Sequence, residues 1–388
     1  MAMKKILRVI SSMNPALGGV ATAVDYSAKS LKMANVGCID VLTLDNSQDE
    51  WIKNQSKYYT IHAVGQRFGK YGISIKFITW LYANVNKYDF VIIDGLWRFT
   101  MIAGYVSWLK KVPFCVMPHG MLDPYFKKST LKYICKLPAW FLIDGPVISL
   151  SKYLLFTCTE EKELGLKSYP FYKSEPFIAR LGFDFDRYDG YKSSTSKTFE
   201  NNHEISKDSK VLLFLGRIDP KKGVEILIEA FSSVAKKHDK LLLVLVGPVL
   251  KVYKRKLEIL LENEKISDRV VFVGMLSGED KWSAYKAADF FVLPSHQENY
   301  GITIVESLSI GLPVLVSNKV NIYKEIEGEK AGLICFDDIK SIESSLLEIE
   351  RMSAEEREVL SNNALICFEK YFSDKSFVDG IRRLIDSI

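Results

Sequence analysis

Residues 211–224 read Val-Leu-Leu-Phe-Leu-Gly-Arg-Ile-Asp-Pro-Lys-Lys-Gly-Val. The unbroken apolar run over residues 211–215 predicts a short strand buried on both faces, which is typical of parallel sheets. Gly216 allows a sharp turn after this strand, and an amphipathic segment begins at Gly223 and continues to Lys237. A buried strand, a polar loop and a helix form the repeating unit of a parallel sheet, so this stretch predicts an α/β fold.

The same alternation of apolar runs and amphipathic segments extends along the chain in both directions. The predicted strands cover residues 6–11, 36–44, 90–93, 114–117 and 155–158 in a first series, and 211–215, 241–246, 270–273, 290–293 and 313–316 in a second. We therefore predict two consecutive doubly wound, Rossmann-like domains. Ligands of such sheets bind outside the carboxyl ends of the strands, so we expect a central cleft between the two domains.

A polar segment separates the two series. Residues 191–209 are rich in Lys, Ser, Thr and Asn, which predicts a linker or exposed loop. The expected domains are residues 1–190 and 210–370. The tail reads as two helices divided near residue 373, and we expect the last one, residues 371–388, to pack back toward the first domain.

Composition is consistent with a reducing compartment. The chain has 388 residues, 48% of them hydrophobic, so two domains can bury large cores without disulfide bonds. The six Cys residues show no metal-ligand spacing, and no signal peptide is recognised at the N-terminus. We interpret the apolar stretch 137–156 as core, because Asp144, Gly145 and Pro146 interrupt it. These features predict a cytoplasmic protein.

The charge is unevenly distributed. Residues 1–186 hold 23 Lys+Arg and 15 Asp+Glu, a net +8, and the remainder hold 29 and 32, a net −3. Four lysines lie on the amphipathic segment 125–140: Lys127, Lys128, Lys132 and Lys136. They suggest contact with an anionic membrane surface, although a surface helix packed by its apolar side has the same pattern. No nucleic-acid-binding module is recognised, so nucleic acid is not an expected partner.

Two cations follow the strand at residues 211–215. Arg217 offers a planar fork of donors suited to phosphate, and Lys222 adds a compact charge just before a predicted helix N-terminus, which attracts anions. This combination predicts a diphosphate site, although an ordinary strand-to-helix loop can also carry such charges.

A second polar cluster follows the strand at residues 290–293. Residues 294–301 read Pro-Ser-His-Gln-Glu-Asn-Tyr-Gly and lead into a helix that we expect to end near Ile310. Glu298 precedes this helix, and Glu306 lies inside it. A carboxylate at Glu306 could accept the two hydroxyl protons of a ribose, or it could occupy a surface turn of the helix.

Together these two stretches resemble the retaining glycosyltransferases of family 4, which have the two-domain GT-B fold. The match consists of Gly216-Arg217 with Lys222-Gly223, and of Glu298 and Glu306 separated by seven residues. It is strongest over about residues 210–335. The first half matches more loosely, through Gly18-Gly19 and the stretch 118–124, Pro-His-Gly-Met-Leu-Asp-Pro. That stretch resembles enzymes that build bacterial exopolysaccharides and O-antigens.

The resemblance implies a role for each matching residue. Arg217 and Lys222 would bind the donor diphosphate, Glu298 would lie near the transferred sugar, and His119 would approach that sugar from the first domain. These four are the expected catalytic residues. The remaining donor-binding residues would be Gly18, Gly19, Gly216, Gly274, Met275, Leu276, Asn299, Tyr300, Gly301 and Glu306. By itself, His119 after the strand at 114–117 could be an ordinary loop residue.

The implied reaction moves a hexose from a UDP- or GDP-sugar to a glycan acceptor, expected to be lipid-linked, with retention of configuration. We expect no cofactor and no metal, because Arg217 and Lys222 can stabilise the charge that develops on the diphosphate. The one Asp-x-Asp motif, Asp184 to Asp186, is interpreted as structural. A sugar-nucleotide epimerase or hydrolase on the same fold, or a non-catalytic binding protein, are the alternatives.

Overall fold

The structure is a computed structural model that describes residues 3–17, 19–53, 56–65, 67–69, 71–127, 130–170, 172–183, 194–206 and 208–388, with the side chains of residues 16 and 130–132 excluded. The chain divides into two compact units. Unit 1 comprises Met1–Asp184 and Asp374–Ile388, and unit 2 comprises Phe185–Ser373.

Unit 1 contains a parallel sheet with the strand order β3-β2-β1-β4-β5-β6-β7 in the part of the chain that the structure describes. The strands are β1 (Lys4–Ile10), β2 (Gly37–Thr43), β3 (Thr60–Ala63), β4 (Phe90–Asp94), β5 (Phe114–Met117), β6 (Tyr153–Phe156) and β7 (Glu175–Ile178). The helices are α1 (Gly19–Met33), α2 (Glu50–Lys53), α3 (Ile75–Asn84), α4 (Ile102–Leu109), α5 (Thr130–Ala139), α6 (Gly145–Leu150), α7 (Thr159–Leu166) and α17 (Asp374–Ser387).

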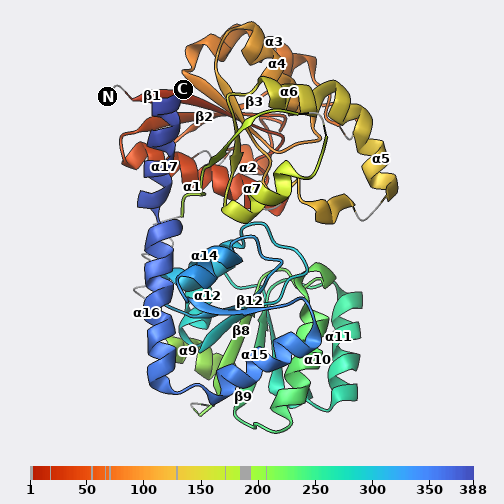
Figure 1. Ribbon diagram of the computed structural model, residues 1–388, viewed down its shortest axis with the longest axis vertical. Coiled ribbons are helices and arrows are strands. Elements are labelled where there is room, and N and C mark those ends of the chain that lie inside the picture. The colour runs from red at the N-terminus through yellow and green to blue at the C-terminus, as the bar shows by residue number, and fades with distance from the viewer. Residues whose placement is uncertain are drawn as a thin grey trace. The chain divides into compact units, whose positions relative to one another are not determined.

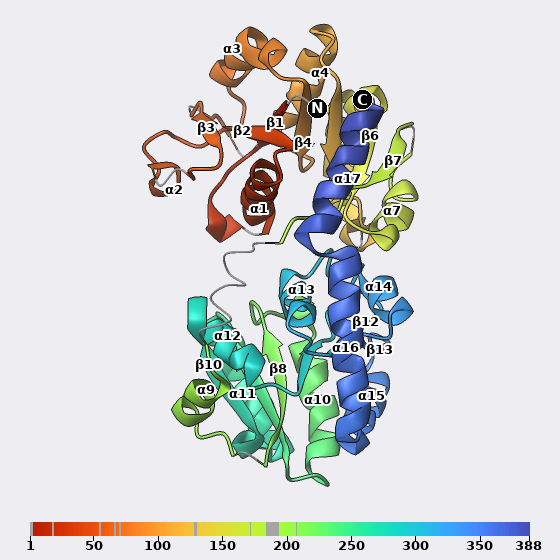
Figure 2. The same ribbon diagram turned by 90° about the vertical axis from the view of Figure 1, so that its left-hand side faces the viewer.

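Unit 2 repeats this architecture with the strand order β10-β9-β8-β11-β12-β13, again among described residues. Its strands are β8 (Lys210–Leu215), β9 (Leu241–Val246), β10 (Val270–Gly274), β11 (Phe290–Leu293), β12 (Val314–Ser317) and β13 (Gly332–Cys335). Its helices are α9 (Ser196–Asn202), α10 (Val224–Ala235), α11 (Lys251–Glu264), α12 (Gly278–Lys286), α13 (Ile302–Ser309), α14 (Tyr323–Gly328), α15 (Ile339–Arg351) and α16 (Ala354–Tyr371). Helices lie on both sides of each sheet (Figures 1 and 2), which explains the continuous apolar strands.

Both sheets change winding direction at an internal pair of strands. In unit 1 strand β1 lies between β2 and β4, and in unit 2 strand β8 lies between β9 and β11. Such switch points open a crevice outside the carboxyl ends of the two strands, which is where doubly wound sheets bind ligands. Ligand-binding residues are therefore expected in two groups of loops: those after β1, β4 and β5 in unit 1, and those after β8 and β11 in unit 2.

The ten strands expected from the sequence are present, with ends shifted by at most two residues, so the predicted α/β class is confirmed. Three strands were missed: β3, β7 and β13. Each lies at a sheet edge. An edge strand is only partly buried and does not need a continuous apolar run, as Glu175-Pro176 in β7 illustrates.

The segment 191–209 is not simply a loop. Within it, α9 is a helix that packs against α12, and its Phe199 is buried. The prediction of a linker or exposed loop is therefore wrong for residues 196–202, because one buried aromatic side chain is enough to fix a short polar helix. At the other end of the chain, α17 belongs to unit 1 and packs against α1, where Ser30 Oγ donates to Asp374 Oδ1 over 2.8 Å.

Helix α5 continues into α6 through a turn of π-helix, η5 (Trp140–Asp144), which follows Pro138. Among the described residues, the stretch Tyr133–Leu150 is long and apolar enough to cross a membrane, judged by length and composition alone. Only 28% of it is buried, and Leu142 is 72% exposed. Our interpretation of residues 137–156 as core is therefore correct for β6 but wrong for the exposed face of η5.

A buried carboxylate anchors this helical segment to the sheet. Asp144 is fully buried, and its Oδ1 accepts the backbone N–H of Trp97 over 3.0 Å. Trp97 follows β4 with φ +62°, a conformation that bulky residues rarely adopt. No described residue hydrogen-bonds to Asp144 Oδ2. Burial raises the pKa of Asp144 to about 6, although the Trp97 hydrogen bond opposes the shift.

We predict that unit 1 loses stability as pH rises through this range. The pKa of Asp144 is higher in the folded than in the unfolded chain, so the folded state binds the proton more tightly, and stability falls from about pH 4 to about pH 6. The fall should be roughly 3 kcal/mol at most. Asp144→Asn should flatten it in urea titrations followed by Trp fluorescence, because all Trp residues except Trp282 lie in unit 1. The control is Asp386→Asn, an exposed carboxylate, and an unchanged pH profile in Asp144→Asn would contradict the account.

Candidate functional site

Three neighbouring strands of unit 1 deliver charged side chains to one place. Arg8 of β1, Asp94 at the end of β4 and His119 just after β5 form a buried group that we call the His119 cluster. Arg8 Nε donates to Asp94 Oδ2 over 2.9 Å, and a second guanidinium nitrogen binds Oδ1. His119 Nε2 lies 2.7 Å from the same Oδ1. The strand order β1-β4-β5 makes this meeting possible.

The loop that carries His119 is held in a strained, defined shape. His119 and Gly120 have φ values of +50° and +77°, so two successive residues are left-handed. The N–H of Gly120 donates to Glu161 Oε1 over 2.5 Å, while Glu161 Oε2 accepts the backbone and hydroxyl of Thr157. Glu161 thus ties the loop after β5 to the loop after β6. Non-glycine residues in left-handed backbone concentrate at functional sites, where the surrounding structure holds them.

In unit 2, backbone hydrogen bonds join the loops at the carboxyl ends of the strands. Gly216 N–H donates to Val246, and Gly247 N–H donates to Gly274, which connects the ends of β8, β9 and β10. His296 N–H donates to the carbonyl of Lys221 over 2.9 Å, which connects the loop after β8 to the loop after β11. The two polar stretches identified in the sequence are therefore neighbours in space.

Gly223 makes a close backbone approach between the loop after β8 and the loop after β11. Its φ is +69°, and a Cβ atom placed on it would lie 2.1 Å from the carbonyl oxygen of Pro294. Only glycine fits this position without moving backbone. Gly223 also precedes α10, so the end of the phosphate-binding loop predicted from the sequence is fixed against the start of the loop that carries Glu298.

The consequence is direct contact between two of the predicted catalytic residues. Lys222 Nζ forms an ion pair with Glu298 Oε2, and both side chains are mostly buried. Arg217 lies elsewhere in the same loop: its side chain is 73% exposed and donates to Asp219 Oδ2 over 2.7 Å. The structure therefore brings Lys222 and Glu298 together and leaves the Arg217 guanidinium largely accessible.

Glu306 is buried, so the alternative interpretation that it occupies a surface turn of the helix is wrong. It is 2% exposed, accepting Lys281 Nζ on Oε1 over 2.6 Å and Tyr285 Oη on Oε2 over 2.9 Å. Burial and the Glu306 charge raise the pKa of Tyr285 well above its ordinary value, so this hydroxyl remains a donor. The carboxylate predicted to hold a ribose is thus already paired with two residues of α12.

The remaining predicted donor-binding residues lie at strand ends or helix starts. Gly274 ends β10, and Met275 and Leu276 follow it, with Met275 strongly exposed. Asn299, Tyr300 and Gly301 precede α13, and the Tyr300 ring packs on Phe372 with 5.8 Å between the ring centres. Gly19 begins α1, whereas Gly18 is outside the described residues.

The described residues contain no group of three His, Cys, Asp or Glu side chains that could hold a metal ion. Asp184 and Asp186 lie outside the described residues, so their interpretation as structural stays a prediction.

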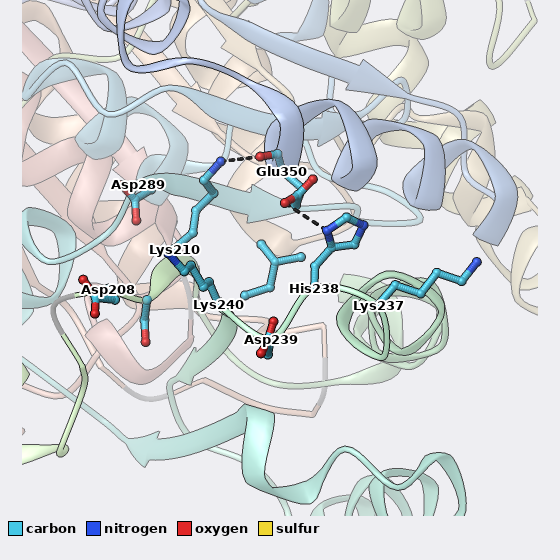
Figure 3. Close-up of a pocket in the computed structure, with 10 residues that line it drawn as sticks. Asp208, Lys210, Lys237, His238, Asp239, Lys240, Asp289 and Glu350 are labelled. Atoms are coloured by element: carbon cyan, nitrogen blue, oxygen red, sulfur yellow. Dashed lines mark hydrogen bonds and ion pairs between the residues drawn. The ribbon is translucent and has the colours of Figure 1, made fainter.

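A pocket of about 520 Å³ lies at the opposite, amino edge of the unit 2 sheet (Figure 3). Some of its charged groups already have partners: His238 Nδ1 lies 2.9 Å from Glu350 Oε1, and Lys210 Nζ donates to the backbone carbonyl of Glu350 over 2.6 Å. Parallel sheets bind ligands at the carboxyl edge instead. We therefore assign no catalytic role to this pocket despite its size.

Sequence reasoning missed the partners of the predicted residues. Arg8 sits inside an apolar strand and Asp94 ends another, and a charge in such a place requires a buried partner, so both could have been noticed. Glu161 and the α12 residues Lys281 and Tyr285 carry no comparable signal, because acidic, basic and aromatic residues are ordinary on amphipathic helices.

The chain is similar to known glycosyltransferases. Residues 195–366 match the family model described as glycosyl transferases group 1. The alpha-monoglucosyldiacylglycerol synthase of Streptococcus pneumoniae is 30% identical over 245 residues, which cover 62% of this chain and 49% of that protein. The lipopolysaccharide 1,2-N-acetylglucosaminetransferase of Salmonella typhimurium is 28% identical over 189 residues, covering 47% and 49%. The alignments thus span about half the length of these relatives.

Among solved structures, HepE of Anabaena in complex with UDP and glucose superimposes with a TM-score of 0.75. The identity is 16%, and the superposition covers 99% of this chain and 100% of that one. At this identity the likeness establishes the fold alone, and it confirms the predicted GT-B fold of two Rossmann-like domains.

We predict that the Gly223–Pro294 approach is essential to the fold of unit 2. Gly223→Ala should destabilise the protein by the left-handed penalty, about 1–2 kcal/mol, and additionally by the clash with the Pro294 carbonyl. Gly278→Ala is the matched control, because its φ of +54° is similar but a Cβ there meets nothing within 4 Å. Denaturant unfolding followed by circular dichroism measures both variants. Equal losses would show that the contact with Pro294 contributes nothing.

Proposed function

We propose that this chain, whose residues 195–366 match the model of the group 1 glycosyltransferases, transfers a hexose from a UDP- or GDP-sugar to a glycan acceptor, with retention of configuration. The observation that carries the proposal is the convergence of Lys222 and Glu298 at the carboxyl edge of the unit 2 sheet. The solved relative that holds UDP and glucose supports a nucleotide-sugar donor.

Lys222 and Arg217 are the groups proposed to bind the donor diphosphate. When the bond between the sugar and the diphosphate breaks, negative charge accumulates on the phosphate oxygens, and fixed cations stabilise it most at that moment. Arg217 is accessible in the structure. Lys222 is paired with Glu298, and a diphosphate carries more charge than one carboxylate, so donor binding draws the ammonium toward the phosphate.

The start of α13 supplies a further stabilising element. The backbone N–H groups from Asn299 onward precede a helix that begins at Ile302, and the first N–H groups of a helix have no partner within it. They favour an anion in front of them. Glu298, released from Lys222, is then placed to stabilise positive charge on the anomeric carbon.

We propose attack on the same face as the leaving group. The bond between the anomeric carbon and the diphosphate oxygen breaks, and the acceptor oxygen bonds to that carbon from the same side. The acceptor proton passes to the departing phosphate oxygen, so a nucleoside diphosphate leaves and configuration is retained. Arg217 and Lys222 carry the charge that a metal ion would otherwise neutralise, so the reaction is proposed to be metal-independent.

We predict that Arg217→Ala and Lys222→Ala each lower turnover at least about a hundredfold, since one donor at developing charge contributes roughly 2.7–4 kcal/mol. The assay follows sugar transfer from UDP- and GDP-hexoses in the presence of EDTA, with Lys221→Ala as the control from the same loop. Release of free sugar without acceptor would favour a hydrolase instead. Near-normal turnover in both variants would refute the diphosphate assignment, and activity that returns only with Mg²⁺ or Mn²⁺ would refute metal independence.

The acceptor is proposed to be lipid-linked, as in assembly of a surface polysaccharide such as O-antigen, capsule or exopolysaccharide. By their names, one of the two relatives described above makes a glycolipid and the other is an N-acetylglucosaminetransferase of lipopolysaccharide. An enzyme with such an acceptor works at a bilayer surface. We therefore propose a cytoplasmic location with peripheral binding to the anionic inner face of the membrane.

Unit 1 has an exposed apolar patch suited to that surface. We define it as Trp108 and Leu109 at the end of α4 and Phe141 and Leu142 of η5, all of them exposed. Tyr105 Oη donates to the carbonyl of Leu142 over 2.9 Å, which holds α4 beside η5. Exposed aromatic and aliphatic side chains with neighbouring lysines are typical of interfacial membrane binding.

The sequence suggested that four lysines of the segment 125–140 contact an anionic membrane, but two of them pack against aromatic rings in the structure. Lys127 Nζ lies 5.0 Å from the centre of the Tyr169 ring, and Lys136 Nζ lies 4.9 Å from the Trp97 ring, so both are packed on aromatic faces. Lys128 and the Lys132 side chain are outside the described residues. Lys110 and Lys111 directly follow Leu109 in the chain, and Lys110 Nζ lies 3.4 Å from the centre of the Tyr82 ring.

We predict that Trp108→Ser combined with Leu142→Ser lowers binding to phosphatidylglycerol vesicles at least about tenfold, because burial of one such side chain contributes about 1.5–3 kcal/mol. Sedimentation at low and high salt measures binding, and salt should weaken it by screening the lysines. The control is Leu250→Ser with Val252→Ser, two exposed apolar residues of unit 2. If both pairs sediment like the wild type, the patch does not bind membranes.

A further inference from the structure

The His119 cluster constrains where the imidazole proton lies. Asp94 is buried, and burial alone would raise its pKa, but the Arg8 guanidinium and the hydrogen bonds from His119 and Arg8 hold that pKa below its usual range. An ionised carboxylate has no proton and only accepts hydrogen bonds. The 2.7 Å contact with His119 Nε2 therefore requires the proton to be on Nε2.

This assignment leaves Nδ1 as the second functional atom. In a neutral imidazole with its proton on Nε2, Nδ1 is an acceptor. Among the described residues, His119 Nδ1 has no hydrogen-bonding partner. It is also not one of the fully buried polar atoms without a partner, so it keeps some exposed surface. The His119 side chain is 5% exposed, so its ring cannot rotate freely to offer the other nitrogen.

Arg8 is needed because a buried carboxylate without a cation would be protonated. If Asp94 became neutral it could donate a proton to the ring, and the other tautomer would then be equally acceptable. Two guanidinium nitrogens bind the two oxygens of Asp94, and a third contact joins Arg8 to Met117 Sδ at 3.8 Å. The β1 cation therefore fixes the state of the β4 carboxylate.

We propose that Arg8 and Asp94 are positioning residues that lock His119 in its Nε2–H tautomer, so that Nδ1 is the atom that accepts a hydrogen bond from a hydroxyl of a bound substrate. The inference rests on the proposed glycosyltransferase function, since it takes that hydroxyl to belong to a sugar. It extends that function to two residues outside the matched family region.

The tautomer itself is measurable without any activity. Long-range ¹H–¹⁵N correlation spectra of the imidazole rings distinguish the two nitrogens, and comparison with His119→Gln identifies its signals among the five His residues of the chain. Over a pH series, the neutral ring of the wild type should show the Nε2–H form alone. Asp94→Asn should give a mixture, because an amide can turn either its oxygen or its NH₂ group to the ring.

The matched control is Asp40→Asn. Asp40 Oδ2 lies 3.6 Å from His62 Nε2 in the same sheet, so this variant makes the same chemical change beside a different histidine. It should leave the His119 signals and sugar transfer as in the wild type. A neutral wild-type ring with its proton on Nδ1 would overturn the proposal, even if Asp94→Asn failed to fold.

A double-mutant cycle separates positioning from general support of the fold. Asp94→Asn should lower kcat at least about tenfold, as loss of a partner that orients a functional imidazole does. In the His119→Gln background the same change should cost less than about twofold, because residues that act as a unit are not additive. If the effects of Asp94→Asn and His119→Gln on kcat multiplied in the double variant, the inference would be refuted. A wild-type kcat for Asp94→Asn would refute it as well. A wild type that transfers no hexose from any UDP- or GDP-sugar would instead refute the proposed function.

Discussion

The approach of Gly223 to the carbonyl of Pro294 is the constraint on which the site in unit 2 depends. A side chain at this position would lie 2.1 Å from the carbonyl oxygen, so the loops after β8 and β11 can meet only because residue 223 is glycine. The neighbouring Lys222 is thereby brought to Glu298. A cation and a carboxylate that are 76 residues apart in sequence become one pair, and their separation by a donor diphosphate is the step that we assign to substrate binding.

Unit 1 uses the same sheet geometry for a different purpose. Its parallel strands also gather their ends at one edge, but the residues that meet there, Arg8, Asp94 and His119, form a closed chain of partners. A buried cation holds a buried carboxylate in its charged form, and the carboxylate orients a histidine. We propose that the cations of unit 2 exchange their carboxylate partners for phosphate, whereas unit 1 presents a fixed hydrogen-bonding atom.

Much of this could be predicted from the sequence. Continuous apolar runs located the inner strands, and the polar residues after 215 and 293 located two loops at the carboxyl edge of the unit 2 sheet, because parallel sheets expose such loops at one edge. The predictions that failed did so for physical reasons. Edge strands such as β7 lack the apolar run, and the polar segment 191–209 contains a helix, α9, that buries Phe199. The ion pairs of Glu306 with Lys281, and of His119 with Asp94, depend on tertiary contacts that spacing along the chain does not encode.

The central claim is that Lys222 exchanges Glu298 for the donor diphosphate. A crystal structure of the protein with bound UDP, or with an unreactive UDP-sugar, tests it most directly. The account predicts diphosphate density in front of the loop 216–223 and the start of α13, with Lys222 Nζ within hydrogen-bonding distance of a phosphate oxygen and Glu298 released. A diphosphate bound elsewhere, such as in the pocket between Lys210 and His238, or an intact Lys222–Glu298 pair beside the bound nucleotide, would contradict it.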